Sequence, residues 1–178
     1  SSDLASVAAD IAVCATMLAG KIPVMINWTL GARTARHALR SARVHHILTS
    51  LRFADNIDTL PFDEIESQLL FLERIRATGI TASMKLRAAV QCRLRRARLL
   101  RVLGLDALDP NSTAVILFTS GSESVPKGVP LSHANLLSNI AGVCAAAAFT
   151  RRDCVLGFLP PFHSFGLTAT LLLPLVCG

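Results

Sequence analysis

The sequence lacks the cysteine patterns that stabilise small secreted domains or hold zinc. Its five cysteines make an odd count, and none of them belongs to a C-x-x-C pair. This spacing argues against a disulfide framework and against a zinc site, and it suits a reducing compartment. Asp3 and Asp10 interrupt the opening stretch, which therefore does not resemble a secretory signal. We expect a cytoplasmic protein whose thiols stay reduced: Cys14, Cys92, Cys144, Cys154 and Cys177.

Aromatic residues are also scarce, at 5% of the 178 residues, whereas hydrophobic residues make up 52%. This composition predicts an α/β fold with one sizeable core. Two uncharged runs, residues 131–149 and 154–178, approach the length of a transmembrane helix. Pro160, Pro161 and Pro174 argue against exposure of the second run to lipid, and several Ser and Asn residues interrupt the first. We therefore expect both runs to be buried elements of the core.

Two common catalytic motifs are missing as well. The phosphate-loop pattern G-x-x-x-x-G-K-[ST] fails, because Pro126 stands where its second glycine should be. The neighbours of Ser164 do not form the G-x-S-x-G elbow of a hydrolase. Any nucleotide site must therefore use a different loop.

Residues 116–129, ILFTSGSESVPKGV, offer such a loop. The apolar run 114–118 predicts a buried strand of a parallel sheet. Hydroxyls, backbone N–H groups and Gly121 follow, and they are suited to hold an anion. Pro126 stiffens the approach to Lys127, whose ammonium can neutralise phosphate oxygens. The structural alternative is a plain turn between this strand and a helix that starts near Ser132.

Two longer strings carry a resemblance to a known family. TSGSESVPKGVPLSHANLLSNI, residues 119–140, resembles the signature loop of the adenylate-forming superfamily of acyl-CoA synthetases, peptide-synthetase adenylation domains and luciferases. FLPPFHSFGLT, residues 158–168, is similar to the next core motif of that superfamily. The pair looks closest to bacterial acyl-[acyl-carrier-protein] synthetases fused to a 2-acylglycerophosphoethanolamine acyltransferase. The implied fold is an incomplete N-terminal AMP-binding domain over residues 1–178, a mostly parallel sheet with flanking helices.

The resemblance implies a chemistry for the loop at residues 119–128. ATP would be clamped there while a carboxylate attacks its α-phosphorus, which gives an acyl-adenylate and pyrophosphate. Lys127 would neutralise the phosphates as a catalytic residue, and Mg²⁺ is implied by the nucleotide. Ser124 departs from the glycine usual in the family. The residues implied to bind the nucleotide are Thr119, Ser120, Gly121, Ser122, Glu123, Ser124, Lys127 and Gly128.

His163 is the second catalytic candidate. In relatives the matching His or aromatic residue lies beside the acyl pocket and the route by which the thiol enters. The alternative is that His163 only packs or donates a hydrogen bond. His133 differs from His163, because it follows Ser132 as the expected N-cap of a helix with Asn135 in its first turn.

Periodicity predicts alternating helices and strands with parallel crossovers. Asp3 is the expected cap of the first helix, which ends at Gly20. The further expected helices are 31–42, 62–76 and 132–148, and the further expected strands are 22–28, 44–49 and 155–159.

The segment from Lys85 to Arg101 holds seven cations and no acid, and its removal would change the formal charge of the chain from +6 to −1. Treated as one helix it is moderately amphipathic, which suits a peripheral anionic membrane surface. The alternatives are a solvated helix or insertion and a nucleic-acid site. No aromatic residue lies in the run to stack on a base, so we expect no nucleic-acid partner.

We expect a fragment of an ATP-dependent ligase that activates a fatty acid for transfer to acyl carrier protein or coenzyme A. In this family the adenine and ribose sites and a late catalytic lysine should lie beyond Gly178, so the isolated fragment should be inactive. An amino-acid-activating adenylation domain and a degenerate, non-catalytic membrane-associated module are the alternatives.

Overall fold

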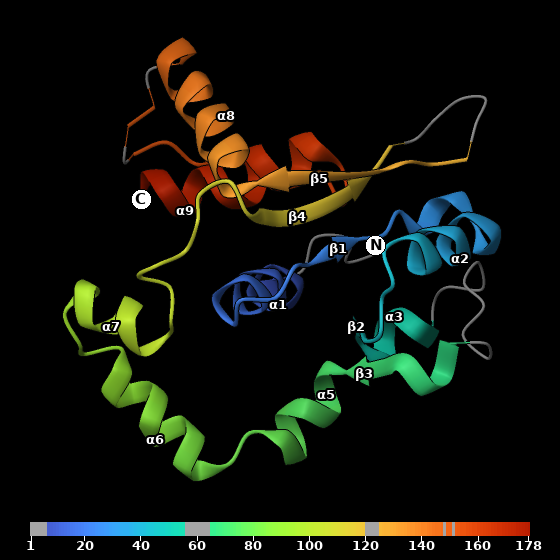
Figure 1. Cartoon of the computed structure of the whole chain (residues 1–178), viewed down its shortest axis with the longest axis horizontal. Coiled ribbons are helices and arrows are strands. Elements are labelled where there is room, and N and C mark those ends of the chain that lie inside the picture. The colour runs from blue at the N-terminus through green and yellow to red at the C-terminus, as the bar shows by residue number, and fades with distance from the viewer. Residues whose placement is uncertain (1–6, 56–64, 120–124, 148, 151) are drawn as a thin grey trace. The chain divides into compact units, whose positions relative to one another are not determined.

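The computed structural model describes residues 7–55, 65–119, 125–147, 149–150 and 152–178 (Figure 1). The chain divides into two compact units. The first unit joins Ser1–Asn27 to Asp109–Gly178, and the second is Trp28–Leu108. Both expected motifs therefore belong to the first unit and the basic segment to the second.

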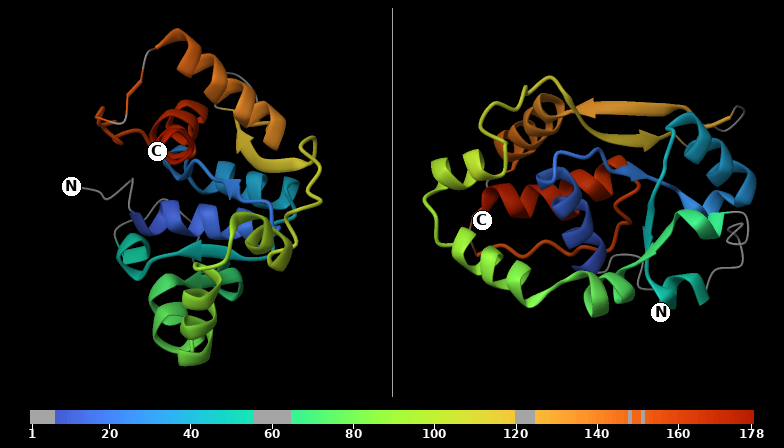
Figure 2. Two further views of the ribbon diagram at one scale, coloured as in Figure 1. Left: turned by 90° about the vertical axis from the view of Figure 1, so that its left-hand side faces the viewer. Right: turned by 60° about the horizontal axis from the view of Figure 1, so that its bottom comes forward.

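A three-stranded sheet organises the first unit, in the order β1 (Val24–Met25), β4 (Thr113–Phe118) and β5 (Gly128–Ser132). β1 runs parallel to β4, and β4 runs antiparallel to β5 (Figure 2). The apolar run 114–118 is a largely buried strand, as expected, and it lies at the centre of the sheet between one parallel and one antiparallel neighbour. β5 is a hairpin partner that the sequence did not predict. Its Pro130 is tolerated because β5 lies at the edge of the sheet, where a missing N–H leaves no ladder bond unmade.

Three helical segments contribute to the core of this unit. They are α1 (Val7–Leu18), α8 (His133–Ala146) and a C-terminal pair, the π-helix η4 (Gly166–Leu172) followed by α9 (Leu173–Cys177). Some of their apolar side chains pack with those of β4. The two long uncharged runs are therefore core elements only in part, because residues 154–158 are exposed and α8 buries only Leu136 and Ile140. No described helix is both long enough and apolar enough to cross a membrane. The buried cluster consists of Val13, Ala114, Val115, Leu117, Leu136, Leu167 and Leu171.

The start of α8 agrees with the expected cap. Ser132 Oγ accepts a hydrogen bond from the Asn135 backbone N–H at 3.1 Å. Asn135 Oδ1 in turn accepts one from the Ser132 backbone N–H at 3.0 Å. The two residues thus satisfy backbone donors that the first turn of a helix leaves without partners.

The second unit contains a two-stranded parallel sheet of β2 (Ile47–Thr49) and β3 (Leu69–Phe71). Before β2 come the 3-10 turn η1 (Trp28–Leu30) and α2 (Ala32–Ser41), and after it comes α3 (Leu51–Asp55). The 3-10 turn η2 (Glu66–Gln68) precedes β3. Downstream of β3 lie α5 (Leu72–Arg74), the π-helix η3 (Ile75–Gly79), α6 (Ala82–Gln91) and α7 (Arg96–Val102).

Three expected elements are wrong. The predicted helix 62–76 contains β3, because pairing of Leu69–Phe71 with β2 overrides the helical spacing of its apolar residues. The predicted strand 155–159 is irregular and has no partner strand among the described residues, and Leu156 and Phe158 are exposed. The basic segment 85–101 is not one helix, since the chain turns between α6 and α7. The first expected helix exists as α1, and its expected cap, Asp3, lies outside the described residues. The remaining expected helices and strands exist with shorter bounds.

Candidate functional site

The two ends of the expected phosphate loop are joined by hydrogen bonds. The Thr119 backbone N–H donates to the Lys127 carbonyl oxygen at 3.1 Å. The Lys127 N–H donates to Thr119 Oγ1 at 3.3 Å, so one side-chain hydroxyl completes the closure. The hairpin therefore continues one residue beyond the Phe118–Gly128 pair that ends the β4–β5 ladder. We name this pair of bonds the Thr119–Lys127 closure.

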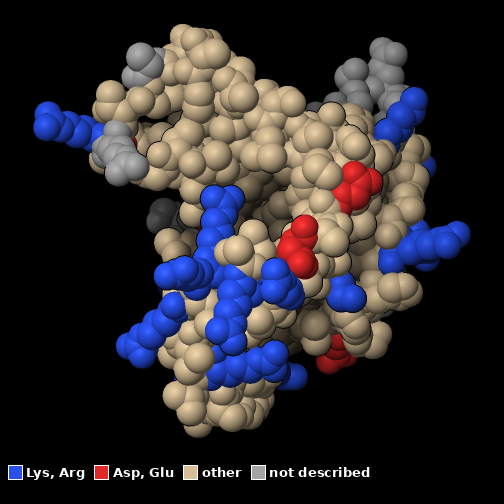
Figure 3. Space-filling view, turned by 60° about the vertical axis from the view of Figure 1, so that its left-hand side comes forward, with Lys and Arg blue, Asp and Glu red and all other residues tan. Residues whose placement is uncertain are grey.

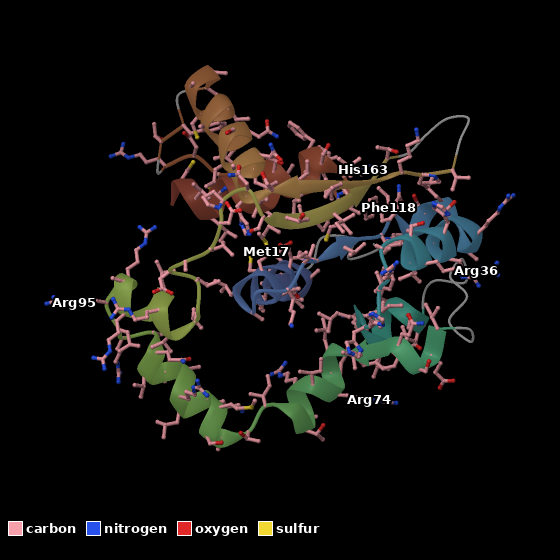
Figure 4. The ribbon with its side chains drawn as sticks, viewed as in Figure 1. Met17, Arg36, Arg74, Arg95, Phe118 and His163 are labelled. Atoms are coloured by element: carbon pink, nitrogen blue, oxygen red, sulfur yellow. The ribbon has the colours of Figure 1, made fainter. Side chains whose placement is uncertain are left out.

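The closure leaves the Lys127 side chain exposed at the mouth of the loop, next to the exposed Thr119. Within the described part of the chain no carboxylate pairs with Lys127, and an exposed ammonium on a fixed main chain can contact an anion as a mobile point charge. Gly128 follows on β5, and a Cβ at that position would lie 3.2 Å from the Phe118 ring. A side chain there would press on Phe118, which is labelled in Figure 4 at the end of β4, so glycine permits the close pairing that precedes the loop.

The middle of the loop lies outside the described residues. This concerns the expected nucleotide-binding residues Ser120, Gly121, Ser122, Glu123 and Ser124. Their roles, like those of Thr119, Lys127 and Gly128, stay predictions. What the structure adds is the closed frame from which that loop extends.

The second motif forms a turn that leads directly into a helix. The Pro160 carbonyl oxygen accepts from the His163 N–H at 3.1 Å, and the His163 carbonyl oxygen accepts from the Leu167 N–H at 2.9 Å. Gly166 is buried against this turn, and a Cβ on it would overlap the Pro160 carbonyl oxygen. Thr170 Oγ1 donates to the Gly166 carbonyl oxygen at 2.6 Å. The turn that carries His163 is therefore fixed to the helix by backbone contacts.

His163, which is labelled in Figure 4, is exposed. Its imidazole is tilted 52° against the ring of the buried Phe162, with the ring centroids 4.7 Å apart. Phe162 supplies the packing at this position, so the imidazole nitrogens remain accessible to solvent. This favours a surface role for His163 over a role as a packing residue. No hydrogen bond between described residues joins His163 to Lys127 or Thr119, although both motifs belong to one unit.

Sequence reasoning missed two features that shape these segments, the role of Gly166 and the strand β5. Gly166 was read only as part of a motif, and the closeness of its backbone to Pro160 could not be known before the turn was seen. The edge strand β5, the second partner of β4, was also missed, because its residues, GVPLS, were assigned to the loop and turn before the helix that starts near Ser132.

The described residues contain no group of three His, Cys, Asp or Glu side chains that could hold a metal. A cavity of about 340 Å³ in the second unit is lined by basic residues of α2 and by none of the expected site residues. Within that helix Arg36 Nε donates to the Ala32 carbonyl oxygen, and the His37 ring contacts Ser41 Oγ. Arg36 and His37 therefore have partners within α2 itself. The nucleotide hypothesis therefore rests on the first unit.

Comparison with known proteins identifies the family. A family profile described as "AMP-binding enzyme" matches residues 5–178. The chain therefore belongs to the AMP-binding enzyme family, which confirms the resemblance drawn from the two motifs.

Individual relatives share shorter stretches with the chain. A long-chain-fatty-acid–CoA ligase of Bacillus subtilis (strain 168) is 39% identical over 74 residues, which is 39% of this chain and 13% of the relative. A medium-chain-fatty-acid–[acyl-carrier-protein] ligase of Moorena producens (strain JHB) is 35% identical over 71 residues, 40% of this chain and 12% of the relative. The chain thus corresponds to only a small part of such ligases.

Among solved structures, a malonyl-CoA ligase in a ternary product complex with methylmalonyl-CoA and AMP has a TM-score of 0.68. The superposition covers 97% of this chain and 31% of that protein, at 23% identity. A likeness at this identity establishes the fold alone. The α/β architecture is thereby confirmed as that of the N-terminal part of adenylate-forming enzymes.

Proposed function

We propose that the protein to which this chain belongs is an acid–thiol ligase that activates a carboxylic acid with ATP. The carboxylate oxygen bonds to the α-phosphorus of ATP and the bond to the β-phosphate oxygen breaks, which releases pyrophosphate. A thiol then attacks the acyl carbon, loses its proton and displaces AMP to leave a thioester. The observation that carries this proposal is the Thr119–Lys127 closure, which holds an exposed lysine at the end of the family's signature loop.

The residues that are present suit a polyphosphate. Pyrophosphate leaves with concentrated negative charge, and a cation on a fixed backbone stabilises such charge without reorganising. Lys127 would supply that cation, and the backbone and hydroxyls from Thr119 to Ser124, with Gly128, would bind phosphate oxygens. Magnesium, when bound with the nucleotide, would neutralise further phosphate charge.

His163 would act in the second step, in which the thiol attacks the acyl-adenylate, and it would lie beside the acyl chain and the incoming thiol. Its exposed ring on a turn fixed by Gly166 supports this position, since a residue that meets a second substrate must remain accessible. His163→Ala should raise the KM for the thiol and leave ATP binding unchanged.

We propose a fatty acid as the substrate, with acyl carrier protein or coenzyme A as the acceptor and the cytoplasm as the location. The fatty-acid ligases among the relatives support this substrate class. They include one ligase that acts with coenzyme A and one that acts with acyl carrier protein, so both acceptors remain part of the proposal.

Pyrophosphate exchange into ATP by the full-length protein tests the first step. Exchange that requires a fatty acid supports the proposal, and exchange that requires an amino acid favours an adenylation domain instead. If the folded protein exchanges with neither, the ligase assignment is wrong and the non-catalytic alternative gains.

Lys127→Ala tests the assigned residue. A hydrogen bond to a charged group contributes about 1.5–3 kcal/mol, so ATP affinity should fall by about 10- to 100-fold. Lys21→Ala is the matched control, because Lys21 is an exposed lysine of the same unit outside both motifs. Equal ATP affinity in the two variants would remove Lys127 from the site.

A further inference from the structure

The helices α6 and α7 form an exposed basic surface in the second unit. Every residue from Arg76 to Val90 is exposed, so α6 has no buried face in the described structure. Figure 3 shows Lys and Arg side chains gathered over this region, and Figure 4 shows Arg95 pointing away from the ribbon. We call the seven cations and the apolar side chains among them the α6–α7 surface. Its cations are Lys85, Arg87, Arg93, Arg95, Arg96, Arg98 and Arg101.

The cations of this surface do not serve the local structure. Arg95, Arg96 and Arg98 lie at the amino end of α7, where the helix dipole favours acidic groups, and the first turn of α7 contains none. Of these seven cations, only Arg101 forms an ion pair with a described residue, a contact of 3.9 Å with Asp106 between two exposed side chains. A helix that only faces solvent would not need seven cations close together, or arginines at the amino end where the helix dipole disfavours them. The charge therefore points to an anionic partner.

The apolar side chains of α6 indicate which kind of anionic partner fits this surface. Leu86 and Val90 are one turn apart, so they share one face, and their side chains are 69% and 54% exposed. Lys85 and Arg87 fall on the two sides of that face at the helical repeat of about 3.6 residues. An apolar strip bordered by long cations suits a bilayer interface, where the strip enters the acyl boundary and the cations reach the headgroup phosphates.

We propose that the α6–α7 surface binds an anionic lipid membrane, with α6 lying in the plane of the interface. This proposal is independent of the ligase chemistry, because it uses none of the residues assigned to ATP or thiol. Residues 82–102 contain no aromatic side chain to stack on a base, so the surface fits lipid better than single-stranded nucleic acid. A second copy is disfavoured because two such surfaces would repel one another.

The test is co-sedimentation of the full-length protein with vesicles of phosphatidylcholine and phosphatidylglycerol in equal parts, and with phosphatidylcholine alone. We expect binding to the anionic vesicles that weakens as salt rises, and little binding to the neutral ones. Absence of binding to either, which is also the result if another part of the chain covers α6, overturns the proposal. Equal binding to both overturns it too, as does binding of an RNA or DNA oligonucleotide in place of vesicles.

A triple variant, Arg93→Gln with Arg95→Gln and Arg98→Gln, should weaken anionic-vesicle partitioning by about 100-fold, since each cation near such a surface contributes about fivefold. The control removes the same charge from exposed positions elsewhere, by changing Lys21, Arg33 and Arg40 to Gln. An equal loss in both would show that only net charge matters and would overturn the assignment to this surface. Pyrophosphate exchange should be unchanged in the triple variant, which separates failure of membrane binding from failure of the ligase function.

Discussion

The two units of the chain differ in where their stability and their charge lie. The first unit has four Lys or Arg and five Asp or Glu residues, and it contains the buried cluster around β4. The second has fourteen Lys or Arg and seven Asp or Glu, and its buried apolar residues are few. Those in the described part are Ala35, Ala38, Leu39 and Ile65. The motifs that bear on chemistry thus sit on a packed frame, whereas the charge sits on exposed helices.

Because of this difference, we expect the two units to respond differently to substitutions that change side-chain volume or backbone. A side chain in the first unit is held by neighbours on several elements, so a change in volume or backbone is transmitted to the loops it carries. Residues 76–90 are all exposed in the described structure, so packing does not restrict which side chains they carry. Their side chains can therefore be suited to contact with a partner outside the protein. Paired substitutions, one in each unit, test this contrast.

The largest effect should come from removing apolar side chains. Leu167 is 1% exposed and Leu86 is 69% exposed. Leu167→Ala should lower the free energy of unfolding by about 2–5 kcal/mol, because it leaves a cavity. Leu86→Ala should change it by less than about 0.5 kcal/mol. Urea unfolding measures the free energy of unfolding of both variants, and hydrogen exchange of the β4 amides reports on the first unit locally. Similar losses of stability in the two variants would contradict the expected difference between the units.

A second pair adds one methyl group to a glycine. In Gly166→Ala the new Cβ meets the Pro160 backbone, so the turn must move, at a cost of about 1–3 kcal/mol. In Gly79→Ala the Cβ makes ordinary contact with Ile75 at 3.6 Å, and we expect no loss of stability. Thermal unfolding distinguishes them, and the Gly166 variant should also slow thioester formation by displacing His163. A fully stable Gly166→Ala protein would contradict the close packing of this turn.

Helix caps give a third pair. Ser132 takes part in the reciprocal cap of α8, which packs on the core, whereas Thr81 Oγ1 accepts from the Met84 N–H at 3.3 Å on the exposed α6. Each change to Ala removes about 1 kcal/mol of helix stability. Only Ser132→Ala should reduce protection of the β4 amides from hydrogen exchange. The reason is that α8 packs against the core that contains β4, whereas α6 has no buried residues. Loss of β4 protection in Thr81→Ala would mean that the helices of the second unit are coupled to the core of the first.

The smallest effect concerns thiol reactivity. Cys177 Sγ lies 3.3 Å from Cys144 Sγ, and the hydrogen bond between them, with burial and the charge of Cys144 adding to it, raises the pKa of the Cys177 thiol. Only the thiolate is alkylated, so a raised pKa leaves less reactive form at neutral pH. Iodoacetamide should therefore label Cys177 more slowly than the exposed Cys92 of the second unit.

Cys144→Ala provides the control, because it removes the partner and should speed labelling of Cys177. Peptide mass mapping over a range of pH measures both rates, and the gap between the two cysteines should narrow as pH rises. Unchanged labelling of Cys177 in the variant would show that the thiol pair does not form.

The predictions from sequence succeeded where one local signal decided the structure. The apolar run before Thr119 became the central strand β4, and Ser132 with Asn135 became a helix cap, because both depend on neighbours in the sequence. They failed where distant partners decided. The apolar residues of segment 62–76 have helical spacing, yet Leu69–Phe71 pair with β2 as a strand. GVPLS forms an edge strand only because β4 lies beside it.

The amino-acid sequence by itself determined the family, the two motifs that carry the resemblance to it, and the concentration of positive charge between Lys85 and Arg101. These follow from residue identity and order alone. Only the tertiary structure decided that Thr119 and Lys127 are joined by hydrogen bonds, that Gly166 fixes the turn of His163, and that α6 buries no face against the other described residues. Such facts depend on which segments meet across the chain, and contacts of that kind are set by the sum of many packing choices rather than by any short stretch of residues.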